Sequence, residues 1–382
     1  MVQSVNIPIL DLVQQYATIE AEVNDAVLEV LASGGYIGGS RVLNFEKQFA
    51  TYVNVSECVV CNSGTDALYL ALRALDIGVG DEVITTPFSF FATTEVISAV
   101  GATPVFVDID AQTFNLDINQ VATAITGKTK AIVPVHLFGQ PMDMTGLTAI
   151  ASSYQLAVIE DCAQATGAIW AEKRVGSIGH IGCFSFYPTK NLGACGDGGA
   201  ITTNDPAIAA KVRMLREHGS KDRYLHEAIG VNSRLDAIQA VILQIKLQHL
   251  DTWNAQRSAI AKRYHQLLSH IPGVIIPPEL AGGEGVWNQY TIRLSGGEQG
   301  DSDNNNYRDK VRQKLQAQGV GSMIYYPLPL HLQPVYNNLG YQPGQLPVAE
   351  QACHEVLSLP MFPELSTEQQ EQVVYRLKDC LE

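Results

Sequence analysis

The chain has 382 residues, of which 46% are hydrophobic and 17% charged, and its formal net charge is −14 at pH 7. That length exceeds what one compact core usually holds, so we expect about two domains. The acidic balance, without a basic cluster, argues against nucleic acid or an anionic membrane as a partner.

The N-terminus and the cysteines bear on where the protein works. The opening MVQSVNIPIL lacks the basic start and long apolar core of a signal peptide, and no apolar run approaches the roughly 20 residues that span a bilayer. There are seven cysteines, and Cys58 and Cys61 form a CxxC without a second pair at zinc spacing. We expect this pair in or beside a buried strand, with no metal, and the protein in the reducing cytoplasm.

The first part of the chain predicts helices joined by a glycine-rich loop. Residues Ile7–Leu12 read as an extended lead-in, and Tyr16–Ala32 carries apolar residues at helical spacing. Glycines then cluster between Ser33 and Gly39, which indicates a loop, and Phe45–Val53 resumes a helix.

Short apolar runs next alternate with amphipathic helices. The predicted strands are Cys58–Cys61, Glu82–Thr86, Pro104–Val107, Ala131–Val135, Ala157–Ile159, Gly182–Ser185 and Ala200–Thr203. The predicted helices between them are Thr65–Leu75, Ala92–Val100, Ile118–Ile125 and Met144–Tyr154. This alternation indicates an α/β fold with a mostly parallel sheet of about seven strands covered on both faces, in which ligands bind beyond the carboxyl ends of the strands.

The last third of the chain changes character. It is helical from Asn232 to about His270, and the composition changes after Pro272. The elements predicted beyond are strands at Ile275–Pro278, Trp287–Leu294 and Ser322–Tyr326, a polar loop at Gly296–Asn306, and helices at Tyr307–Gly319 and Thr367–Leu381. We divide the chain into a lead-in at 1–12, a large domain at 13–250 and a smaller α+β domain at 251–382.

The stretch FSFYPTKNLGACGDGGA at Phe184–Ala200 is the one around which the chain is organised. Its proline and glycines exclude a helix or regular strand, so a strand must pass into a tight loop that carries Lys190. A solvated loop lysine is one interpretation. The other is a lysine that forms a Schiff base, with an amine that loses its proton in a partly desolvated pocket.

Asn62–Ala67, with the sequence NSGTDA, follows a strand and opens a helix. Such a helix N-terminus offers free N–H groups and partial positive charge, which suit a phosphate. A simple helix cap at Ser63 or Thr65 is the alternative. No GxxxxGK[ST] follows, so this is not a nucleotide P-loop.

Two carboxylates, Glu160 and Asp161, end the apolar strand of the next motif, and Gln164 follows three residues after Asp161. A carboxylate at a strand end can keep a pyridinium nitrogen protonated, which makes the ring a better electron sink. A helix cap with a solvated Glu–Asp pair is the alternative.

Three weaker signals complete the set. Ser185 can donate to a phosphate, and Asn232 and Arg234 are expected to open a helix. The aromatic cluster at Pro87–Phe91 can lie in the core or stack on a flat cofactor. A lysine for an imine, an aspartate for a ring nitrogen, a phosphate site and a stacking ring together describe pyridoxal 5′-phosphate.

The chain resembles the DegT/DnrJ/EryC1/StrS family of sugar aminotransferases over nearly its full length. The strings that carry the resemblance are NSGTDAL (62–68), GDEVITTPFSFFAT (80–93), PVFVDID (104–110), PVHLFGQPMDM (134–144), IEDCAQATGA (159–168), FSFYPTKNLGACGDGG (184–199), GVNSRLDAIQA (230–240) and YYPLPLHLQP (325–334). The resemblance implies the fold type I of pyridoxal-phosphate enzymes and a homodimer with a shared active site.

The resemblance also implies residue roles. Lys190 matches the catalytic lysine, Asp161 the partner of the ring nitrogen, and Gln164 the side chain near the ring hydroxyl. The remaining matches are Gly64, Thr65 and Ser185 at the phosphate, Phe90 stacked on the ring, Asn232 reaching the phosphate from the neighbouring subunit, and Arg234, Tyr326 and His331 on the nucleotide-sugar side. The stretch at 287–291, WNQYT, lacks the histidine that some relatives carry.

The expected function is transfer of an amino group from glutamate to a nucleotide-linked keto sugar, at a 3-keto position, for cell-surface polysaccharide assembly. One branch of the family replaces the lysine with histidine and is a dehydratase; Lys190 favours transamination here. A dehydratase that kept its lysine and a regulatory protein without turnover are the alternatives.

Overall fold

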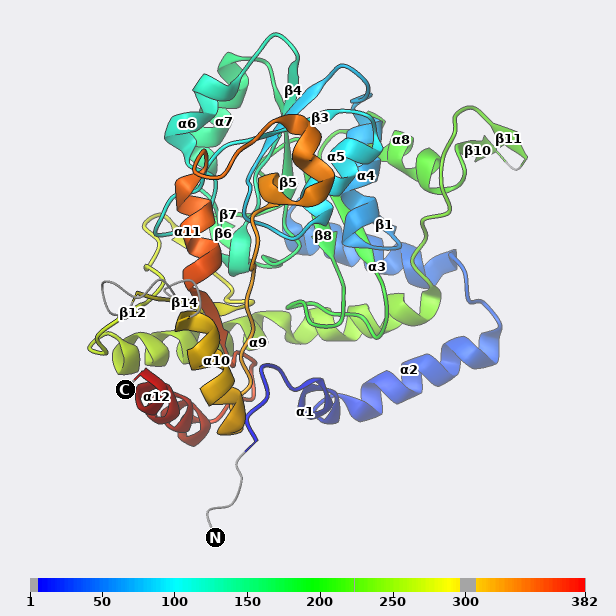
Figure 1. The fold of residues 1–382 in the computed structure, drawn as a ribbon. Helices are drawn as coiled ribbons and strands as arrows, with labels where there is room; N and C mark the ends of the chain where they lie inside the picture. The colour runs from blue at the N-terminus through cyan, green and yellow to red at the C-terminus, as the bar shows by residue number, and fades with distance from the viewer. Residues whose placement is uncertain (1–5, 223, 296–306, 382) are drawn as a thin grey trace.

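A seven-stranded sheet forms the centre of the computed structural model, which describes residues 6–222, 224–295 and 307–381 (Figure 1). The strand order is β1-β9-β8-β5-β4-β2-β3. The strands are β1 (Glu57–Cys61), β2 (Glu82–Thr85), β3 (Thr103–Phe106), β4 (Thr129–Val133), β5 (Ala157–Asp161), β8 (Ile181–Ser185) and β9 (Gly199–Thr203). All seven predicted strands are therefore confirmed, with ends shifted by one or two residues.

Every strand of this sheet runs in the same direction except β9, which pairs antiparallel with both β1 and β8. The strands carry few solvent-facing residues, and β8 and β9 are buried along their whole length. Burial on both faces explains why these strands appear as continuous apolar runs rather than as alternating patterns.

Helices cover both faces of the sheet and make three layers. Side chains on one face of the sheet, such as Val83, Ile159 and Ile201, pack against α4, α5 and α8. Their neighbours on the opposite face pack against α3 and α9, or against α6 and α7. These helices are α3 (Gly39–Val53), α4 (Gly64–Ala74), α5 (Ala92–Ala99), α6 (Ile118–Ala124), α7 (Met144–Ser153), α8 (Pro206–Arg216) and α9 (Ala237–Leu268).

The N-terminal helix differs from the prediction. Tyr16–Ala32 is not one helix but part of two, α1 (Leu12–Ala17) and α2 (Glu20–Ser33). The hydroxyl of Thr18 donates to the carbonyl of Gln15, and Ile19 adopts a non-helical conformation with its side chain buried. Burial of Ile19 thus overrides a continuous helical pattern.

A second, smaller unit packs around the C-terminal half of α9. Its core joins that half-helix to a three-stranded antiparallel sheet of order β12-β14-β15 and to α10 and α12. Its elements are β12 (Val274–Ile275), β14 (Tyr290–Leu294), α10 (Tyr307–Ala317), α11 (Pro347–Glu355), β15 (Val356–Leu359) and α12 (Thr367–Leu381). The division proposed at residue 250 falls inside α9 and stays a prediction.

The strand predicted at Ser322–Tyr326 is wrong. Only Met323 makes a ladder contact there, a single bridge to Ser358. The third strand of the small sheet is β15, which follows α11 directly and which the apolar pattern alone did not reveal. The predicted polar loop at Gly296–Asn306 lies outside the described residues.

Short elements complete the fold. Strand β6 (Ile169–Trp170) pairs with β7 (Lys173–Arg174) and β13 (Gly283–Glu284), and β10 (Ser220–Asp222) pairs with β11 (Leu225–His226). One-turn or short 3₁₀ helices lie at Leu137–Gly139, Leu330–Leu332 and Pro334–Leu339. Within the described part of the chain, no helix combines the length and the apolar character needed to cross a bilayer.

Candidate active site

The register of the sheet brings two distant motifs together. Gly199, the first residue of β9, lies opposite Cys61 at the end of β1 and opposite Ser185 at the end of β8. A Cβ at Gly199 would overlap the carbonyl of Ser63. The loops after β1 and β8 therefore meet at the same edge of the sheet.

The N-terminus of α4 lies at this meeting point. Ser63 caps the helix, because its hydroxyl accepts from the N–H of Asp66 at 3.1 Å and its carbonyl accepts from the N–H of Ala67 at 3.0 Å. Among the described residues, the first two amides, of Gly64 and Thr65, have no such partner, and they lie at the positive end of the helix dipole. The cap at Ser63 and an anion site at Gly64 and Thr65 are thus compatible.

Gly64 is required by the close approach of β8. A Cβ there would lie 2.6 Å from the Cβ of Ser185, inside van der Waals contact. The hydroxyl of Ser185 is buried beside it and accepts from the N–H of Tyr187 at 3.3 Å. A serine hydroxyl and two helix amides thus lie around one point, as a phosphate requires.

Lys190 follows β8 in the tight loop predicted for it. Its N–H donates to the carbonyl of Tyr187, and a Cβ at Gly193 would overlap the carbonyl of Pro188, so the loop folds closely on itself. Desolvation lowers the pKa of Lys190 to about 8, against the opposing charge of Asp161. The amine can therefore be neutral near physiological pH, unlike that of a solvated lysine.

Asp161 ends β5 with its side chain on the sheet face covered by α5. Its Oδ2 accepts from the hydroxyl of Thr93 at 2.9 Å and its Oδ1 from the N–H of Ala163 at 3.1 Å. Burial raises the pKa of Asp161, while those two bonds and the charge of Lys190 act in the opposite direction. Lys190 and Asp161 thus lie within electrostatic reach of each other although they come from different strand ends.

The alternative of a solvated Glu–Asp pair is wrong, because both side chains are buried. Glu160 points to the opposite face from Asp161, as neighbours in a strand do. Its carboxylate accepts from the N–H groups of Gly176, Ile178 and Gly179 and bonds His136 Nε2 at 3.1 Å.

His136, Glu160 and Cys162 approach one another closely enough to suggest a metal. However, His136 Nδ1 accepts from the N–H of Met142, so its Nε2 carries the proton and donates to Glu160. Since both ring nitrogens and both carboxylate oxygens already have partners, the cluster acts as a buried hydrogen-bonded connection.

Gln164 has one fixed orientation. Its Oε1 accepts from the N–H of Phe138 at 2.6 Å, and its Nε2 donates to the hydroxyl of Tyr326 at 3.1 Å. Phe138 adopts a left-handed conformation, with φ of 58°, that turns its N–H toward Gln164. The structure thereby brings Tyr326 to Gln164 from a segment 162 residues away.

In the aromatic cluster after β2, one ring lies in the core and another lies near the candidate site. Phe88 is fully buried against Phe114, Phe138 and Tyr326, as the core interpretation expects. Phe90 is 59% exposed at the start of α5, one turn before Thr93. An exposed ring next to the residue that holds Asp161 is available for stacking.

Asn232 and Arg234 do not open a helix, because α9 begins at Ala237. Their segment docks against the start of α4 through Ser233, whose hydroxyl accepts from the N–H of Asn62 and donates to Asp66. Asn232 is exposed, and Arg234 pairs with Glu217 at 2.9 Å.

His331 lies apart from these groups. It is 1% exposed, its ring contacts Phe106 and Tyr341, and its Nε2 bonds Glu350 at 3.2 Å. Burial lowers the pKa of His331. Its substrate role stays a prediction, and it would require movement of the surrounding side chains.

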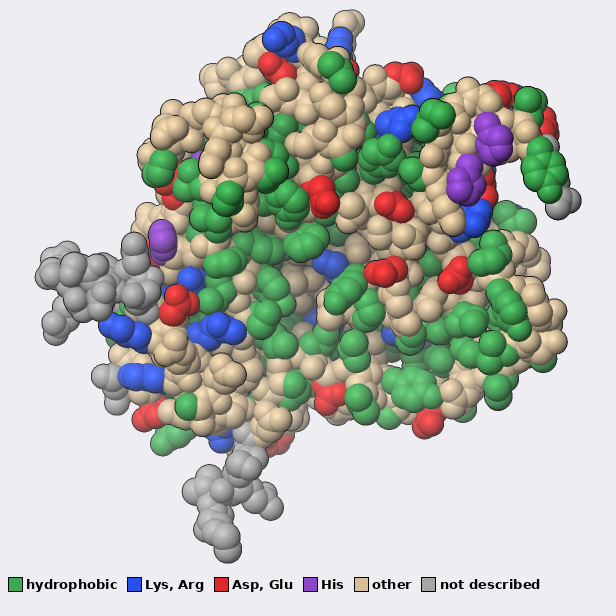
Figure 2. All heavy atoms as spheres, turned by 45° about the vertical axis from the view of Figure 1, so that its right-hand side comes forward, with side chains coloured by type: hydrophobic (Ala, Val, Ile, Leu, Met, Phe, Trp, Pro, Cys, Tyr) green, Lys and Arg blue, Asp and Glu red, His purple; other side chains and the backbone are tan. Residues whose placement is uncertain are grey.

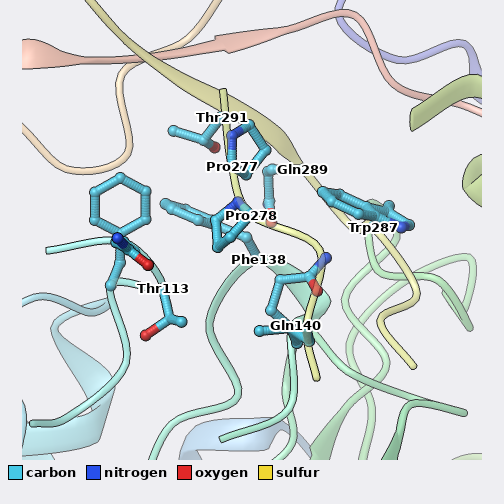
Figure 3. A pocket seen from close by; sticks show the side chains of 11 residues that line it. Thr113, Phe138, Gln140, Pro277, Pro278, Trp287, Gln289 and Thr291 are labelled. Carbon is cyan, nitrogen blue, oxygen red and sulfur yellow. The ribbon is translucent and has the colours of Figure 1, made fainter. Parts of the chain in front are cut away.

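Sequence reasoning missed Thr93, because it lies 68 residues from Asp161 and no spacing rule connects them. It gave no role to Asn288 or Gln289 themselves, and noted at 287–291 only the missing histidine that some relatives carry. These two residues line a cavity of about 500 Å³ beside Thr189, together with the lead-in Pro8–Val13 and Tyr325. Across Gln289 lies a narrow slot of about 10 Å³, between Trp287 and the loop at Phe138 and Gln140, which is too small for a sugar (Figure 3).

Comparison with known proteins agrees with this geometry. The family model described as the DegT/DnrJ/EryC1/StrS aminotransferase family matches residues 17–378. A relative from Geobacillus stearothermophilus, named a pleiotropic regulatory protein, is 50% identical over 98% of both chains. Another, from Acidithiobacillus ferrooxidans, is named UDP-N-acetyl-3-dehydro-alpha-D-glucosamine 3-aminotransferase and is 46% identical over 97% of this chain and 96% of its own.

Solved structures show the same fold. DesV of S. venezuelae, in complex with a ketimine intermediate, superposes with a TM-score of 0.93 at 42% identity over 99% of both chains. A putative sugar aminotransferase from Streptococcus pneumoniae, in its PLP-form, superposes with a TM-score of 0.87 at 27% identity over 94% of this chain and 96% of its own. The expected α/β fold is confirmed.

Proposed function

Because this chain belongs to the DegT/DnrJ/EryC1/StrS aminotransferase family, we propose that it transfers an amino group from glutamate to a nucleotide-linked keto sugar. The enzyme is an aminotransferase of a family that uses pyridoxal 5′-phosphate. Amination at a 3-keto position is part of the proposal, since the Acidithiobacillus relative is named for a 3-dehydro sugar. The product would serve cell-surface polysaccharide assembly.

One observation carries the proposal: a lysine amine of lowered pKa and a buried carboxylate converge from different strand ends. Maintaining such a pair costs stability, because both groups are desolvated. A protein without catalytic turnover has no use for such a destabilising pair, so its presence favours the interpretation that this chain is an enzyme.

The groups around Lys190 fit the cofactor. Gly64, Thr65 and Ser185 would hold its phosphate, Asp161 its ring nitrogen and Gln164 its ring hydroxyl, with Phe90 stacked on the ring. When bound, the pyridoxal ring supplies an electron sink for the breaking C–H bond. Tyr326 and Arg234 would contact the sugar nucleotide, and His331 is the weakest member of that group.

The chain's own residues supply the proton chemistry. The amine of Lys190, which is partly neutral near its pKa of about 8, would accept the proton that leaves the substrate carbon and hold it on Nζ. Asp161 would keep negative charge beside the ring nitrogen, held in place by Thr93.

We further propose a homodimer in which Asn232 reaches the phosphate of the neighbouring subunit. Exposed apolar side chains on and after α2 support a second copy there: Leu28, Leu31, Tyr36, Ile37 and Leu43. Figure 2, which turns this side forward, shows hydrophobic side chains gathered on it. All seven cysteines are free thiols, which fits a reducing cytoplasm.

The test is transamination by Lys190→Ala and Lys190→Arg against the unaltered enzyme, with glutamate and a panel of nucleotide-linked 3-keto sugars. We expect both variants to lose turnover by at least about 1,000-fold, because arginine keeps the charge but not the nucleophilic amine. Wild-type rates in either variant would overturn the mechanism. Mass analysis of the product separates a new amine from the lost hydroxyl of a dehydratase.

A further inference from the structure

Three asparagine side chains form a continuous hydrogen-bonded chain next to the catalytic loop. Asn254 lies in α9, Asn191 directly follows Lys190, and Asn288 precedes β14. All three are at least nine-tenths buried, with exposures of 8%, 3% and 6%. Buried amides are costly unless each of their polar atoms is paired, so the direction of every bond matters.

Backbone carbonyls fix the direction of the first two links, because a carbonyl can only accept. Asn254 Nδ2 donates to the carbonyl of Thr166 at 3.1 Å, which leaves its Oδ1 to accept from Asn191 Nδ2 at 2.7 Å. Asn191 Nδ2 also donates to the carbonyl of Val286 at 2.9 Å. Both hydrogens of Asn191 are therefore used, and its Oδ1 is available only as an acceptor.

The third link ends the chain on an unpaired oxygen. Asn288 Nδ2 donates to Asn191 Oδ1 at 2.8 Å and to the carbonyl of Thr189 at 3.3 Å. Its Oδ1 must then point away from both, and within residues 6–222, 224–295 and 307–381 no donor reaches this buried oxygen. Flipping the amide would place Oδ1 against Asn191 Oδ1 and the carbonyl of Thr189, which are both acceptors, so the orientation cannot reverse.

Asn288 lines the cavity of about 500 Å³ that also borders Thr189, the residue before Lys190. Gln289 lines the same cavity, and its Oε1 is likewise buried without a partner among the described residues. The wall next to the catalytic loop thus presents two acceptor oxygens, which a bound molecule can pair by supplying donors.

We propose that Asn288 is a substrate-binding residue whose Oδ1 accepts a hydrogen bond from a donor group of the substrate held beside Lys190. This inference rests on the proposed function and deepens it. Two substrate groups share that chemistry, a hydroxyl of the keto sugar and the amino group of the amino donor. A substrate that lacks the donor would leave a buried acceptor unpaired, which is how a site rejects an analogue.

The two half-reactions separate these sources. In the first, the enzyme loaded with pyridoxal phosphate is mixed with glutamate; in the second, the enzyme loaded with pyridoxamine phosphate is mixed with the keto sugar, and cofactor absorbance is followed in each. We expect Asn288→Ala to lower kcat/KM about 10- to 100-fold in one half-reaction and less than about threefold in the other. Loss confined to the sugar half identifies a hydroxyl, and loss confined to the glutamate half identifies the amino group.

A conservative variant keeps the test valid if alanine disturbs the fold. In Asn288→Asp the neutral acid can donate to Asn191 Oδ1 and still offer the second oxygen, whereas the carboxylate repels Asn191 Oδ1. We therefore expect the deficit of Asn288→Asp, relative to wild type at each pH, to shrink as pH falls. Gln372→Ala removes another buried amide oxygen, on α12, that no described residue pairs, and should change neither half-reaction.

Three results would overturn the inference: no change for Asn288→Ala, an equal loss in both half-reactions, or a shift in the absorbance of the resting cofactor. The last two would mean that Asn288 only positions the loop of Lys190. A wild-type enzyme that reacts with neither glutamate nor any keto sugar would instead defeat the proposed function, together with this inference. That pattern appears in the wild-type data alone and cannot be confused with the others.

Discussion

At the scale of single residues, one physical cause acts on Lys190 and Asp161 in opposite directions. Desolvation disfavours the charged form of each, so it lowers the pKa of the lysine and raises that of the aspartate. Each charge partly offsets the effect on the other. The amine of Lys190 can therefore release its proton near pH 8, which suits proton transfer.

The pH dependence of cofactor uptake should report the pKa of Lys190. With a pKa of about 8, about a tenth of the amine is neutral at pH 7, against fewer than about one in a thousand at the ordinary lysine pKa of 10.5. We expect the rate of covalent uptake of pyridoxal phosphate by the apoenzyme to rise with pH and level off above a midpoint near 8, as followed by absorbance. A midpoint at or above 10 would contradict the buried environment of the amine.

Replacing Asp161 should affect chemistry more than folding. Asp161→Asn keeps the shape and the bond from Thr93 but removes the negative charge beside the ring nitrogen, so we expect turnover to fall about 100- to 1,000-fold. Thr93→Val is the matched control, since it removes one donor and should lower turnover only about tenfold. Equal losses in steady-state assays of the two variants would count against a charge-based role.

At the scale of elements, the start of α4 depends on the distance between two strands. Gly64→Ala would place a Cβ 2.6 Å from Ser185 Cβ, and relief of that overlap must displace the phosphate site. We expect affinity for pyridoxal phosphate to fall about 10- to 100-fold, as measured by fluorescence titration, because overpacking of this kind costs about 1–3 kcal/mol. Gly127→Ala is the control, since a Cβ at Gly127 meets open space, and its affinity should equal that of wild type.

The buried carboxylate of Glu160 joins the loop at 176–179 to His136 and thereby to the turn that carries Phe138. Glu160→Gln would turn an amide toward N–H donors and leave at least one unpaired, at a cost of about 1–3 kcal/mol. We expect a Tm several degrees below wild type in thermal unfolding. Glu371→Gln breaks an exposed pair with Arg263 and should change Tm by less than a degree or so; equal shifts would argue against a structural role for Glu160.

At the scale of the whole molecule, the apolar surface on and after α2 determines what the chain can associate with. Leu28 is 62% exposed and Ile37 58%. Contiguous apolar surface of this kind marks an interaction site. A symmetric dimer would cover this surface in both copies at once.

The proposed dimer predicts a mass twice that of the chain by light scattering. The double variant Leu28→Glu and Leu31→Glu should shift the population toward monomer and lower turnover together, because Asn232 would then lose the neighbouring site. Val79→Glu, at a residue 92% exposed between α4 and β2, is the control and should leave both readouts unchanged. A wild-type monomer with full activity would refute the shared site.

The sequence by itself determined the seven strands, because each is a short apolar run bounded by turn residues. It also identified Lys190, Asp161 and Gln164 as candidates, because each lies within a few residues of the end of a predicted strand. It failed where burial overrode periodicity, as at Ile19, and where it predicted a strand that the fold does not form, as at Ser322–Tyr326. It also missed β15.

Only the tertiary structure decided which distant groups meet. Thr93 with Asp161, Tyr326 with Gln164, and Asn288 with Asn191 are pairs joined across 68, 162 and 97 residues. Hydrogen bonds depend on distances and directions of a few tenths of an ångström and a few degrees, which strand register and loop packing set. The spacing of residue types along the chain predicts local helices and strands. These contacts between distant residues form only when the layers of the fold pack together.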